Sequence, residues 1–472
     1  MKKEELRLTR ANYERFRDLV MERSGLYFPE AKQRSLRRGL AEALEVSSSD
    51  GLDEYYEMLR CSPSDSSVWD CLVSALTVGE TYFFRNKGHF DALAQHILPE
   101  LIERWEHRNR RIRIWSAGCA TGEEPYSIAM LLRDLIPRPE SWNILILATD
   151  INRDALRQAQ QGVYGTWSFR GVEKRVQDRY FRLDGNKRFA IADDIKRMVT
   201  FDYLNLVDDY YPSLANNTNA MDVILCRNVT IYFNSEVTQQ AVNKFYKCLT
   251  NGGRLIVGSS EPNLEFYREF ETETFPGAVV YRKPVVAKAE ESPVFVFEPQ
   301  KPVVKPPPLD PYKEALTLLQ AGRVDESLTK LYEKLDQDPS FVPAYYTLGR
   351  VYANKGNLAE AQNWCERAVQ KDKLQAEPYL VLSMIYQQFD LLEMAIDNLK
   401  KTLYLEPTLA LAHYNLANIY RQQGNAKLAR KSFQNVQRLL KDKPRDELIP
   451  EGDGLVVGRL LQLVKVALVS GA

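Results

Sequence analysis

Residues 112–132 read IRIWSAGCATGEEPYSIAMLL, and this stretch decides the fold of the first half of the chain. Its first apolar residues, Ile112 to Trp115, are typical of a buried strand, and the apolar residues after Pro125 predict a helix. Between them, the small residues around Gly118 and Gly122 let the backbone approach a ligand at the carboxyl end of the strand. A strand, a glycine-containing loop and a helix in this order predict an α/β domain with a binding site at the loop.

Three later apolar runs repeat the strand pattern, at residues 144–148, 222–225 and 254–257, with helical stretches between them. This alternation predicts a parallel sheet with crossover helices. The segment around Asp184-Gly185-Asn186 reads as short strands about a hairpin turn, which adds a small β-subdomain. We expect the α/β domain to cover residues 81–283.

The residues before this domain predict helices, because apolar side chains recur at helical spacing. We therefore expect a separate helical domain over residues 1–80. The segment 284–309 is rich in proline, which disfavours helix and favours an extended chain. It is predicted to be a semi-rigid linker.

Beyond the linker the sequence repeats with a period of 34 residues. Leucine, tyrosine, alanine and glycine each recur in phase, with Asp390 in one glycine slot; the positions are Leu348, Leu382, Leu416, Tyr352, Tyr386, Tyr420, Ala361, Ala395, Ala429, Gly322, Gly356 and Gly424. This pattern resembles the tetratricopeptide repeat, a helix-turn-helix unit. It predicts an α-solenoid over residues 310–441, with residues 442–472 as a capping segment. Stacked repeats form a groove that holds a peptide or partner helix, although helical packing without a partner remains the alternative.

Composition excludes several classes of protein. The 472 residues include 63 basic and 63 acidic side chains, so no general positive surplus is available for wrapping nucleic acid. The first residues lack the apolar core of a signal peptide, and we expect a cytoplasmic protein. The six cysteines and four histidines show no ligand spacing, so we expect no structural metal.

The balance of charge is uneven along the chain. Residues 1–40 hold eleven basic and six acidic side chains, and four basic residues crowd one short helical segment: Lys32, Arg34, Arg37 and Arg38. Such a cluster can steer an acidic partner into register. The alternative is an ordinary solvated helix face.

The loop at residues 116–127 also indicates which class of cofactor could bind there. A dinucleotide enzyme would carry G-x-G-x-x-G, whereas this loop has G-x-x-x-G followed by Glu123 and Glu124. Carboxylates repel a pyrophosphate but suit a cationic sulfonium and amino group, which favours S-adenosylmethionine over NAD. Asp150, at the end of the second strand, can accept hydrogen bonds from both ribose hydroxyls. A tight turn without a ligand is the alternative.

Three segments together resemble the CheR family, the methyltransferases that esterify glutamates on bacterial chemoreceptors. They are GETYFFR at 79–85, TGEEPYSIA at 121–129 and CRNVTIYF at 226–233. FDYLNL at 201–206 and GGRL at 252–255 also match the family in order. The resemblance covers roughly residues 10–283, and it implies a Rossmann-like class I methyltransferase domain that uses S-adenosylmethionine and releases S-adenosylhomocysteine.

The resemblance implies roles for individual residues. The cofactor contacts would be Gly79, Thr81, Arg85, Glu124, Asp150, Asn205, Leu206, Cys226, Arg227 and Asn228. Of these, Asp150 would bind the ribose, Glu124 the polar end of the cofactor, and Asn205 and Leu206 the adenine. Arg85 and Tyr232 would position the substrate carboxylate and are the catalytic candidates. The family often has asparagine where this chain has Gly79, so a side-chain contact would be absent there.

The implied substrate is a glutamate on the cytoplasmic helices of a chemoreceptor, with Lys32 and its basic neighbours at the docking surface. The repeats would hold the receptor or another, unidentified protein, or would instead bind the protein's own catalytic domain and regulate it. One alternative is a non-catalytic scaffold that binds S-adenosylmethionine. A nucleic-acid methyltransferase would want an Asn/Asp-Pro-Pro-aromatic motif, and this chain has Arg227-Asn228-Val229-Thr230 after the relevant strand. Structural roles are also open: Arg85 could pair with a carboxylate, Tyr232 could be a core aromatic and Asn205 could cap a helix.

Overall fold

The computed structural model of the chain describes residues 6, 8–47, 49–63, 66–185, 187–285 and 310–469. They divide into two compact units. The described residues of 1–283, 444–447 and 454–462 form one unit, and the described residues of 284–443, 448–453 and 463–469 form the other. Apart from Pro284 and Val285, the predicted linker 284–309 lies outside the described residues.

The N-terminal part of the first unit is helical, as the sequence predicts. Its helices are α1 (Arg10–Ser24), η1 (Glu30–Lys32), α2 (Gln33–Val46), α3 (Leu52–Cys61) and α4 (Ser67–Leu76). The Thr9 side chain caps α1 by accepting a hydrogen bond from Asn12 N, and Gly25, with φ of 75°, ends it. Phe16, Leu36 and Tyr55 from three of these helices are fully buried in a common core.

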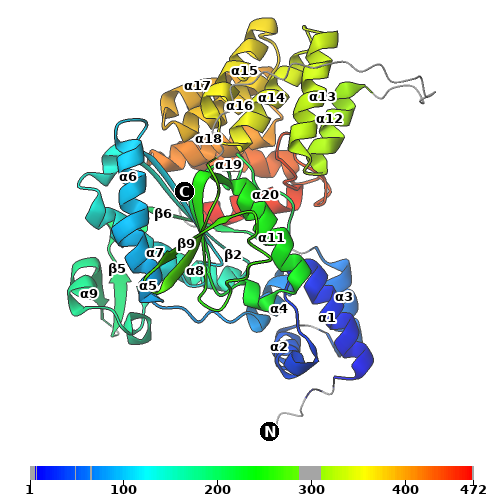
Figure 1. Cartoon of the computed structure of the whole chain (residues 1–472). Helices are drawn as coiled ribbons and strands as arrows, with labels where there is room; N and C mark the ends of the chain where they lie inside the picture. Colours follow the sequence, from blue (N-terminus) through cyan, green and yellow to red (C-terminus); the bar gives the residue numbers. More distant parts are fainter. Residues whose placement is uncertain are drawn as a thin grey trace. The chain divides into compact units, whose positions relative to one another are not determined.

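The α/β part holds a seven-stranded sheet with the order β6-β2-β1-β7-β8-β10-β9. Figure 1 labels three of its strands, β2, β6 and β9. Its strands are β1 (Arg111–Ala117), β2 (Asn143–Asp150), β6 (Val199–Tyr203), β7 (Met221–Cys226), β8 (Leu249–Val257), β9 (Glu271–Phe275) and β10 (Ala278–Arg282). The first five strands in this order are parallel, which confirms the predicted parallel arrangement. The last two, β10 and β9, add an antiparallel hairpin at one edge that the sequence reading missed.

The remaining elements of the α/β part are helices and a small second sheet. The helical elements are α5 (Lys87–Ala92), η2 (Leu93–Ile97), α6 (Leu98–Glu106), α7 (Glu123–Leu135), η3 (Pro139–Ser141), α8 (Arg153–Gln161), η4 (Thr166–Phe169), α9 (Lys174–Tyr180), α10 (Asp193–Lys196), η5 (Thr230–Tyr232) and α11 (Ser235–Cys248). Strands β3 (Val163–Tyr164), β4 (Phe181–Asp184) and β5 (Arg188–Ile191) form the predicted small β-subdomain, with β5 in the middle.

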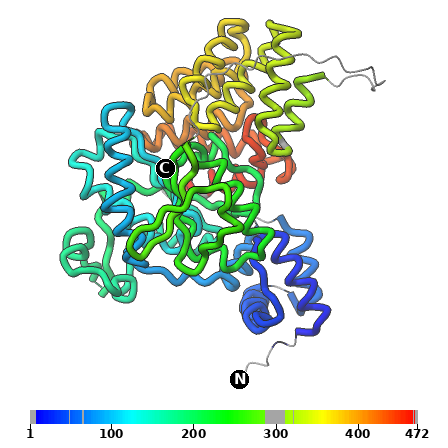
Figure 2. The backbone as a smooth tube through the Cα atoms, in the orientation of Figure 1, coloured from blue at the N-terminus to red at the C-terminus, as the bar shows by residue number. Residues whose placement is uncertain are grey.

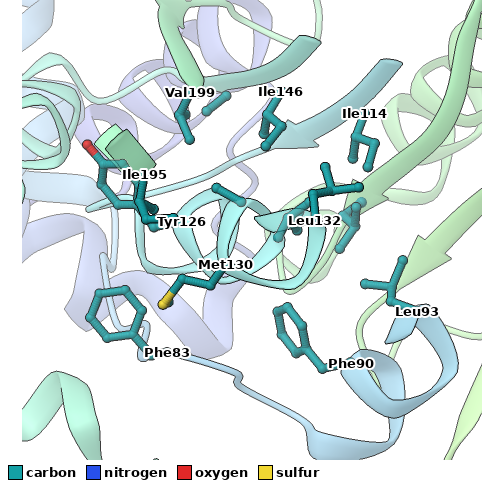
Figure 3. Packing of buried hydrophobic residues seen from close by; sticks show 14 of the residues in the cluster. Phe83, Phe90, Leu93, Ile114, Tyr126, Met130, Leu132, Ile146, Ile195 and Val199 are labelled. Atoms are coloured by element: carbon teal, nitrogen blue, oxygen red, sulfur yellow. The ribbon is translucent and has the colours of Figure 1, made fainter. Parts of the chain in front are cut away.

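One apolar core joins the main sheet, α7 and the β-subdomain (Figure 3). Met130 of α7 packs in the same cluster as Ile114 and Ile146 of the neighbouring strands β1 and β2. Phe83, which precedes α5, is 1 % exposed, and its ring lies 4.8 Å from Tyr164 and 5.2 Å from Phe169. This packing ties Phe83 to β3 and η4, and the next residue, Phe84, donates its N–H to the Ser127 hydroxyl of α7 at 3.0 Å.

The repeats form the predicted α-solenoid, drawn from yellow-green to orange in Figures 1 and 2. Its helices are α12 (Pro311–Gln320), α13 (Val324–Gln337), α14 (Val342–Asn354), α15 (Leu358–Lys371), α16 (Glu377–Gln388), α17 (Leu392–Leu405), α18 (Ala410–Gln422) and α19 (Ala426–Leu440). Each turn within a repeat needs a left-handed residue, and Asp390, with φ of 59°, takes the conformation that Gly356 takes with φ of 81°. Gly349 permits close packing, because a Cβ there would lie 2.3 Å from the Cys365 sulfur.

The C-terminal helix α20 (Val457–Val469) divides between the two units. The sequence predicts a cap on the last repeat, but residues 454–462 belong to the first unit. The physical reason is Arg459, which is 5 % exposed, pairs with Asp202 at 3.0 Å and lies 4.4 Å from the Tyr203 ring. A capping role for the rest of the helix stays a prediction. None of the described helices has the length and apolar character needed to cross a membrane.

Candidate active site at the carboxyl edge of the sheet

The loop after β1 folds back onto the end of β2. The backbone N–H groups of Gly118 and Cys119 both donate to the Thr149 carbonyl, at 2.8 and 2.9 Å. Ala120 N then donates to an oxygen of Asp150 at 2.8 Å. The glycines adopt φ values that other residues avoid, 83° at Gly118 and 93° at Gly122. The loop and the acidic residue predicted for the ribose therefore form one local structure.

Asp150 is arranged to accept further hydrogen bonds. Its other oxygen accepts from Asn152 N at 2.8 Å, so each carboxylate oxygen has a backbone donor and retains acceptor capacity. Burial raises the pKa of Asp150, and the backbone hydrogen bonds from Asn152 and Ala120 oppose that rise. A carboxylate at this strand end suits the two hydroxyls of a ribose.

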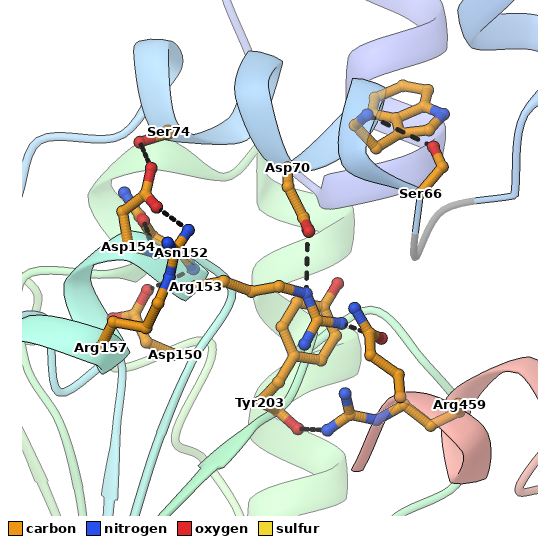
Figure 4. Close-up of polar contacts among 12 residues, drawn as sticks. Ser66, Asp70, Ser74, Asp150, Asn152, Arg153, Asp154, Arg157, Tyr203 and Arg459 are labelled. Atoms are coloured by element: carbon orange, nitrogen blue, oxygen red, sulfur yellow. Dashed lines mark hydrogen bonds and ion pairs between the residues drawn. The ribbon is translucent and has the colours of Figure 1, made fainter. Parts of the chain in front are cut away.

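Polar contacts connect this strand end to the N-terminal helices (Figure 4). Asn152 donates to the Thr77 hydroxyl at 2.8 Å. The next residue, Arg153, pairs with Asp70 of α4 at 2.9 Å. Ser74 of α4 also donates to Asp154, at 2.8 Å. These bonds hold the helical domain against the edge of the sheet where Asp150 lies.

Glu124 and Arg227, both predicted site residues, form a buried ion pair. Their closest atoms are 2.8 Å apart, and the Arg227 and Glu124 side chains are only 2 % and 12 % exposed. Ser116 donates to the other Glu124 oxygen at 2.7 Å, and Arg227 also donates to the Arg85 carbonyl at 2.5 Å. The pair thus joins three sequence segments that the sequence analysis predicted to share a site.

Glu123 is a buried acid to which the sequence analysis assigned no residue-specific role. It accepts hydrogen bonds from Ser168 at 2.9 Å and from Thr121 at 2.6 Å. Burial raises its pKa, and these two hydroxyls and the nearby Arg170 oppose that rise. Glu123 therefore ties the loop after β1 to the β-subdomain.

The turn at Cys226 and Asn228 is held by Glu261, which the sequence analysis missed. One Glu261 oxygen accepts from Asn228 N at 2.7 Å and Gly258 N at 2.6 Å, and the other from Val229 N at 3.0 Å and the Thr230 hydroxyl at 2.8 Å. Its signal in the sequence was an acid in the GSSEP stretch directly after the strand 254–257. A carboxylate that accepts several backbone donors fixes the shape of a turn.

The two catalytic candidates lie near each other. The Arg85 guanidinium donates to the Glu80 carbonyl at 2.7 Å. Burial raises the pKa of Tyr232, and the positive charge of Arg85 opposes that rise. Lys32, from the basic cluster, lies 5.7 Å from the centre of the Tyr232 ring. The basic segment and the predicted catalytic tyrosine are therefore neighbours in space.

Asn205 makes structural contacts in this structure. Its amide nitrogen donates to the Arg23 carbonyl at 2.8 Å, and its side-chain oxygen accepts from Val207 N at 3.4 Å. Leu206 beside it is buried. At Gly79, a Cβ would meet nothing within 4 Å, and Thr81 is partly exposed. Contacts of these four residues with the adenine or with the rest of the cofactor stay predictions.

Two thiols in the site are unsuited to act as nucleophiles. Burial raises the pKa of Cys119 and of Cys226 well above the usual range, and nearby carboxylates raise both further. Among the described residues, no group of three or more histidines, cysteines and acids could hold a metal ion.

A surface hollow of about 720 Å³ lies beside the site, between α1 and the start of α11. Its lining includes Arg17, Met21, Phe233 and Glu236. A second hollow of about 480 Å³ shares Met21 and Glu236 and reaches Val207. The predicted cofactor residues line neither of these two hollows.

The carboxyl groups at this edge of the sheet fit S-adenosylmethionine. Asp150 has acceptor capacity for a ribose, and the start of α7 carries two further carboxyl groups, Glu123 and the Arg227-paired Glu124. Such acceptors suit the hydroxyls and the amino group of S-adenosylmethionine, whereas carboxylates donate no hydrogen bonds to a pyrophosphate.

Four family models match parts of the chain. A model described as CheR methyltransferase, all-alpha domain, matches residues 11–77, and one described as CheR methyltransferase, SAM binding domain, matches residues 79–276. Two tetratricopeptide repeat models match residues 318–385 and 410–439.

Two curated relatives match this chain over different lengths, one over the methyltransferase part and one over most of the chain. "Chemotaxis protein methyltransferase 2" of Vibrio cholerae serotype O1 is 33 % identical over 288 residues, which is 61 % of this chain and 98 % of the relative. "Probable biofilm formation methyltransferase WspC" of Pseudomonas aeruginosa is 28 % identical over 440 residues, 90 % of this chain and 98 % of the relative. Among solved structures, MamA of Desulfovibrio magneticus RS-1 is 22 % identical with a TM-score of 0.26, covering 28 % of this chain and 75 % of that one.

The domain models and the relatives agree with the family that the motifs indicated. The methyl donor of this fold is S-adenosylmethionine. The chain therefore belongs to the CheR family of methyltransferases, with tetratricopeptide repeats after the catalytic domain.

Proposed function

We propose that the chain transfers the methyl group of S-adenosylmethionine to glutamate side chains of a chemoreceptor-like protein in the cytoplasm, forming glutamyl methyl esters. The observation that carries this proposal is the position of Lys32, 5.7 Å from the Tyr232 ring. An acidic receptor helix that docks on the basic segment would bring its glutamates to the tyrosine. The names of relatives, chemotaxis protein methyltransferase in Vibrio cholerae and in Pseudomonas aeruginosa, support the same reading.

The chemistry needs no general base. S-adenosylmethionine, when bound, supplies an electrophilic methyl on a positively charged sulfur. A glutamate with a reference pKa of about 4.3 is already ionised at neutral pH. When the cofactor is bound, the oxygen would form a bond to the methyl carbon as the carbon–sulfur bond breaks with its electron pair kept by sulfur, and S-adenosylhomocysteine would be the product.

The contribution of the protein is then orientation and the exclusion of water. Alignment of the reacting atoms can lower the barrier by several kcal/mol, roughly 7 or more in the best cases. Arg85 and the Tyr232 hydroxyl are the groups we assign to holding the carboxylate. Their hydrogen bonds must stay weak enough to leave the oxygen nucleophilic, because its charge is neutralised in the transition state.

Three structural elements support the cofactor assignments. Asp150 would bind the ribose, and Glu124, held by Arg227, would face the amino end of the cofactor. The Glu261 carboxylate would keep the turn at Cys226–Asn228 in shape beside the transferable methyl. Arg34, Arg37 and Arg38 would complete the receptor surface around Lys32.

The test is incubation of the purified chain with methyl-labelled S-adenosylmethionine and a receptor-containing lysate, followed by mild alkali. Methyl esters release volatile labelled methanol, and N-methyl products do not. Release of methanol from a receptor-sized protein is the expected result. Labelled protein that is stable to alkali would overturn the proposal, and S-adenosylhomocysteine binding without any labelled protein would favour the non-catalytic scaffold.

A further inference from the structure

In stacked helical repeats the first helices of successive repeats line one side of the array; here they are α12, α14, α16 and α18, and we call that side the first-helix face. Stacked repeats make such a face into an extended binding surface. Arg350 and Asn354 lie one turn apart on α14. The 34-residue period gives the equivalent positions on α16 and α18, which are Met384, Gln388, Asn418 and Gln422.

The first-helix face is already contacted by the chain itself. Residues 448–453, LIPEGD, which we call the acidic loop, belong to the same compact unit as the repeats. Arg350 forms an ion pair with Glu451 and lies 3.5 Å from an oxygen of Asp453. Asn354 donates to the other Asp453 oxygen at 3.4 Å. One guanidinium and one amide thus contact two carboxylates that are two residues apart.

The acidic loop is largely buried where it contacts the repeats. The charged side chains of Arg350, Glu451 and Asp453 are only 16 to 17 % exposed. Glu451 and Asp453 have φ values of 59° and 48°, a left-handed conformation that is uncommon for residues other than glycine. Ile449 is 5 % exposed and its carbonyl accepts from Gly452 N at 3.1 Å, which closes the turn.

Like charges lie close together where the acidic loop meets Arg350. The Arg350 guanidinium contacts two carboxylates, those of Glu451 and Asp453, and both hold its pKa above the usual value against the effect of burial. Burial raises the pKa of Glu451, and the charges of Asp453 and Glu377 raise it further, against the effect of Arg350. Repulsion between these acids opposes the attraction of Arg350 for the acidic loop.

The polar character continues along the first-helix face. Asn418 occupies the position of Arg350 two repeats later, and its side-chain oxygen is buried without a hydrogen-bond partner among the described residues. The amide nitrogen of Asn415, one turn before it, is in the same condition. Buried amides without partners are costly, and a peptide backbone can supply both a donor and an acceptor.

We propose that the first-helix face is a binding site for acidic peptide segments of a partner protein, and that the acidic loop is its built-in competitor. The partner would present two carboxylates two residues apart on a short turn, as Glu451 and Asp453 do. Because the loop is tethered, its effective concentration is in the millimolar range, so a partner must carry additional contacts to displace it. The proposal does not depend on methyl transfer.

The experiment uses the full chain and a fluorescein-labelled peptide of residues 446–456, DELIPEGDGLV, with binding followed by fluorescence anisotropy. The variant E451Q/D453N removes the competing charges from the tethered loop. We expect it to bind the peptide at least about tenfold more tightly than the wild type. Adding R350M, which places at 350 the residue that the repeat carries at 384, should then remove that gain.

Two controls separate charge recognition from general destabilisation. D442N/D446N neutralises two exposed acids of the same C-terminal segment and should bind like the wild type. A peptide with Gln and Asn at the positions of Glu451 and Asp453 should not bind E451Q/D453N, and this result does not depend on whether R350M folds. Equal binding by the wild type and E451Q/D453N, or equal binding of the charged and amide peptides, would overturn the proposal.

Discussion

The Lys32 ammonium lies 5.7 Å from the centre of the Tyr232 ring and 3.5 Å from the Ile231 carbonyl, although 200 residues separate lysine and tyrosine in the chain. The basic segment at the start of α2 and the turn after β7 are thus parts of one surface. If an acidic substrate docks on the first, its side chains reach the second. This relationship leads to a prediction about each of the two parts.

Charge reversal of the basic segment should affect the substrate and spare the cofactor. In the R34E/R37E/R38E variant we expect receptor methylation at limiting receptor to fall about tenfold or more, because steering and register depend on complementary charge. Binding of S-adenosylhomocysteine, measured by calorimetry, should stay within about twofold. The matched control K427E/R430E/K431E reverses three exposed charges on α19 and should methylate normally. An unchanged rate for R34E/R37E/R38E at moderate salt would contradict the docking assignment.

Removal of the Tyr232 hydroxyl or the Arg85 guanidinium should slow methyl transfer while cofactor binding remains. A hydrogen bond to a charged group contributes about 1.5–3 kcal/mol, so Y232F and R85A should each lose roughly 10–100-fold in rate. The measurements are single-turnover methylation and S-adenosylhomocysteine affinity. A collapse of affinity in both variants would reassign the two residues to the cofactor.

Substitution of Asp150 should weaken cofactor binding. The Asp150→Asn variant keeps the size of the side chain but loses the charge that would accept ribose hydroxyls, and it places an amide NH₂ near the backbone donors of Ala120 and Asn152. We expect S-adenosylhomocysteine affinity to fall roughly 10–100-fold, from the same range of about 1.5–3 kcal/mol. Full affinity in this variant would place the ribose elsewhere. Asp178→Asn, on the exposed side of α9, is the control and should bind normally.

Glu261 should be essential for the turn that follows β7. In Glu261→Gln one oxygen becomes an NH₂ that faces backbone N–H donors, so hydrogen bonds are lost and a donor meets donors. We expect the free energy of unfolding to fall by about 2 kcal/mol, measured by urea denaturation. Methyl transfer should fall as well. A variant as stable and active as the wild type would show that the turn holds without its carboxylate, while Glu265→Gln, on the exposed loop nearby, should change neither.

His89 should make the fold sensitive to acid. Burial, and secondarily the charge of Arg227, lowers the pKa of His89 from 6.5 to about 4. The unfolded chain therefore binds the proton more readily, so the stability is complete above pH 6.5 and declines as the pH falls from 6.5 towards 4. The loss from this group is about 3 kcal/mol at most. Urea denaturation between pH 7 and 4 should show a flatter dependence for His89→Gln, and identical slopes would contradict the assignment.

Local patterns in the chain determined the classes of structure. Apolar runs around the loop at 118–122 predicted the α/β domain, and the 34-residue period predicted the repeats down to the turn where Asp390 replaces a glycine. Both depend on short-range periodicity, which one sequence displays directly. The antiparallel hairpin of β9 and β10 was not predicted, because it is stabilised by the pairing of β10 with β8, and no local sequence pattern indicates that pairing.

Only the tertiary structure decided which charges meet. The pairing of Glu124 with Arg227, the support of one turn by Glu261, and the contact of Arg350 with the acidic loop each join residues 33 to 103 positions apart. Burial makes a charge costly unless a partner lies within hydrogen-bond distance, so packing selects the partner, and packing is a property of the folded chain. The sequence alone thus determined the family, the cofactor class and the candidate residues, while the folded chain determined how those residues are held.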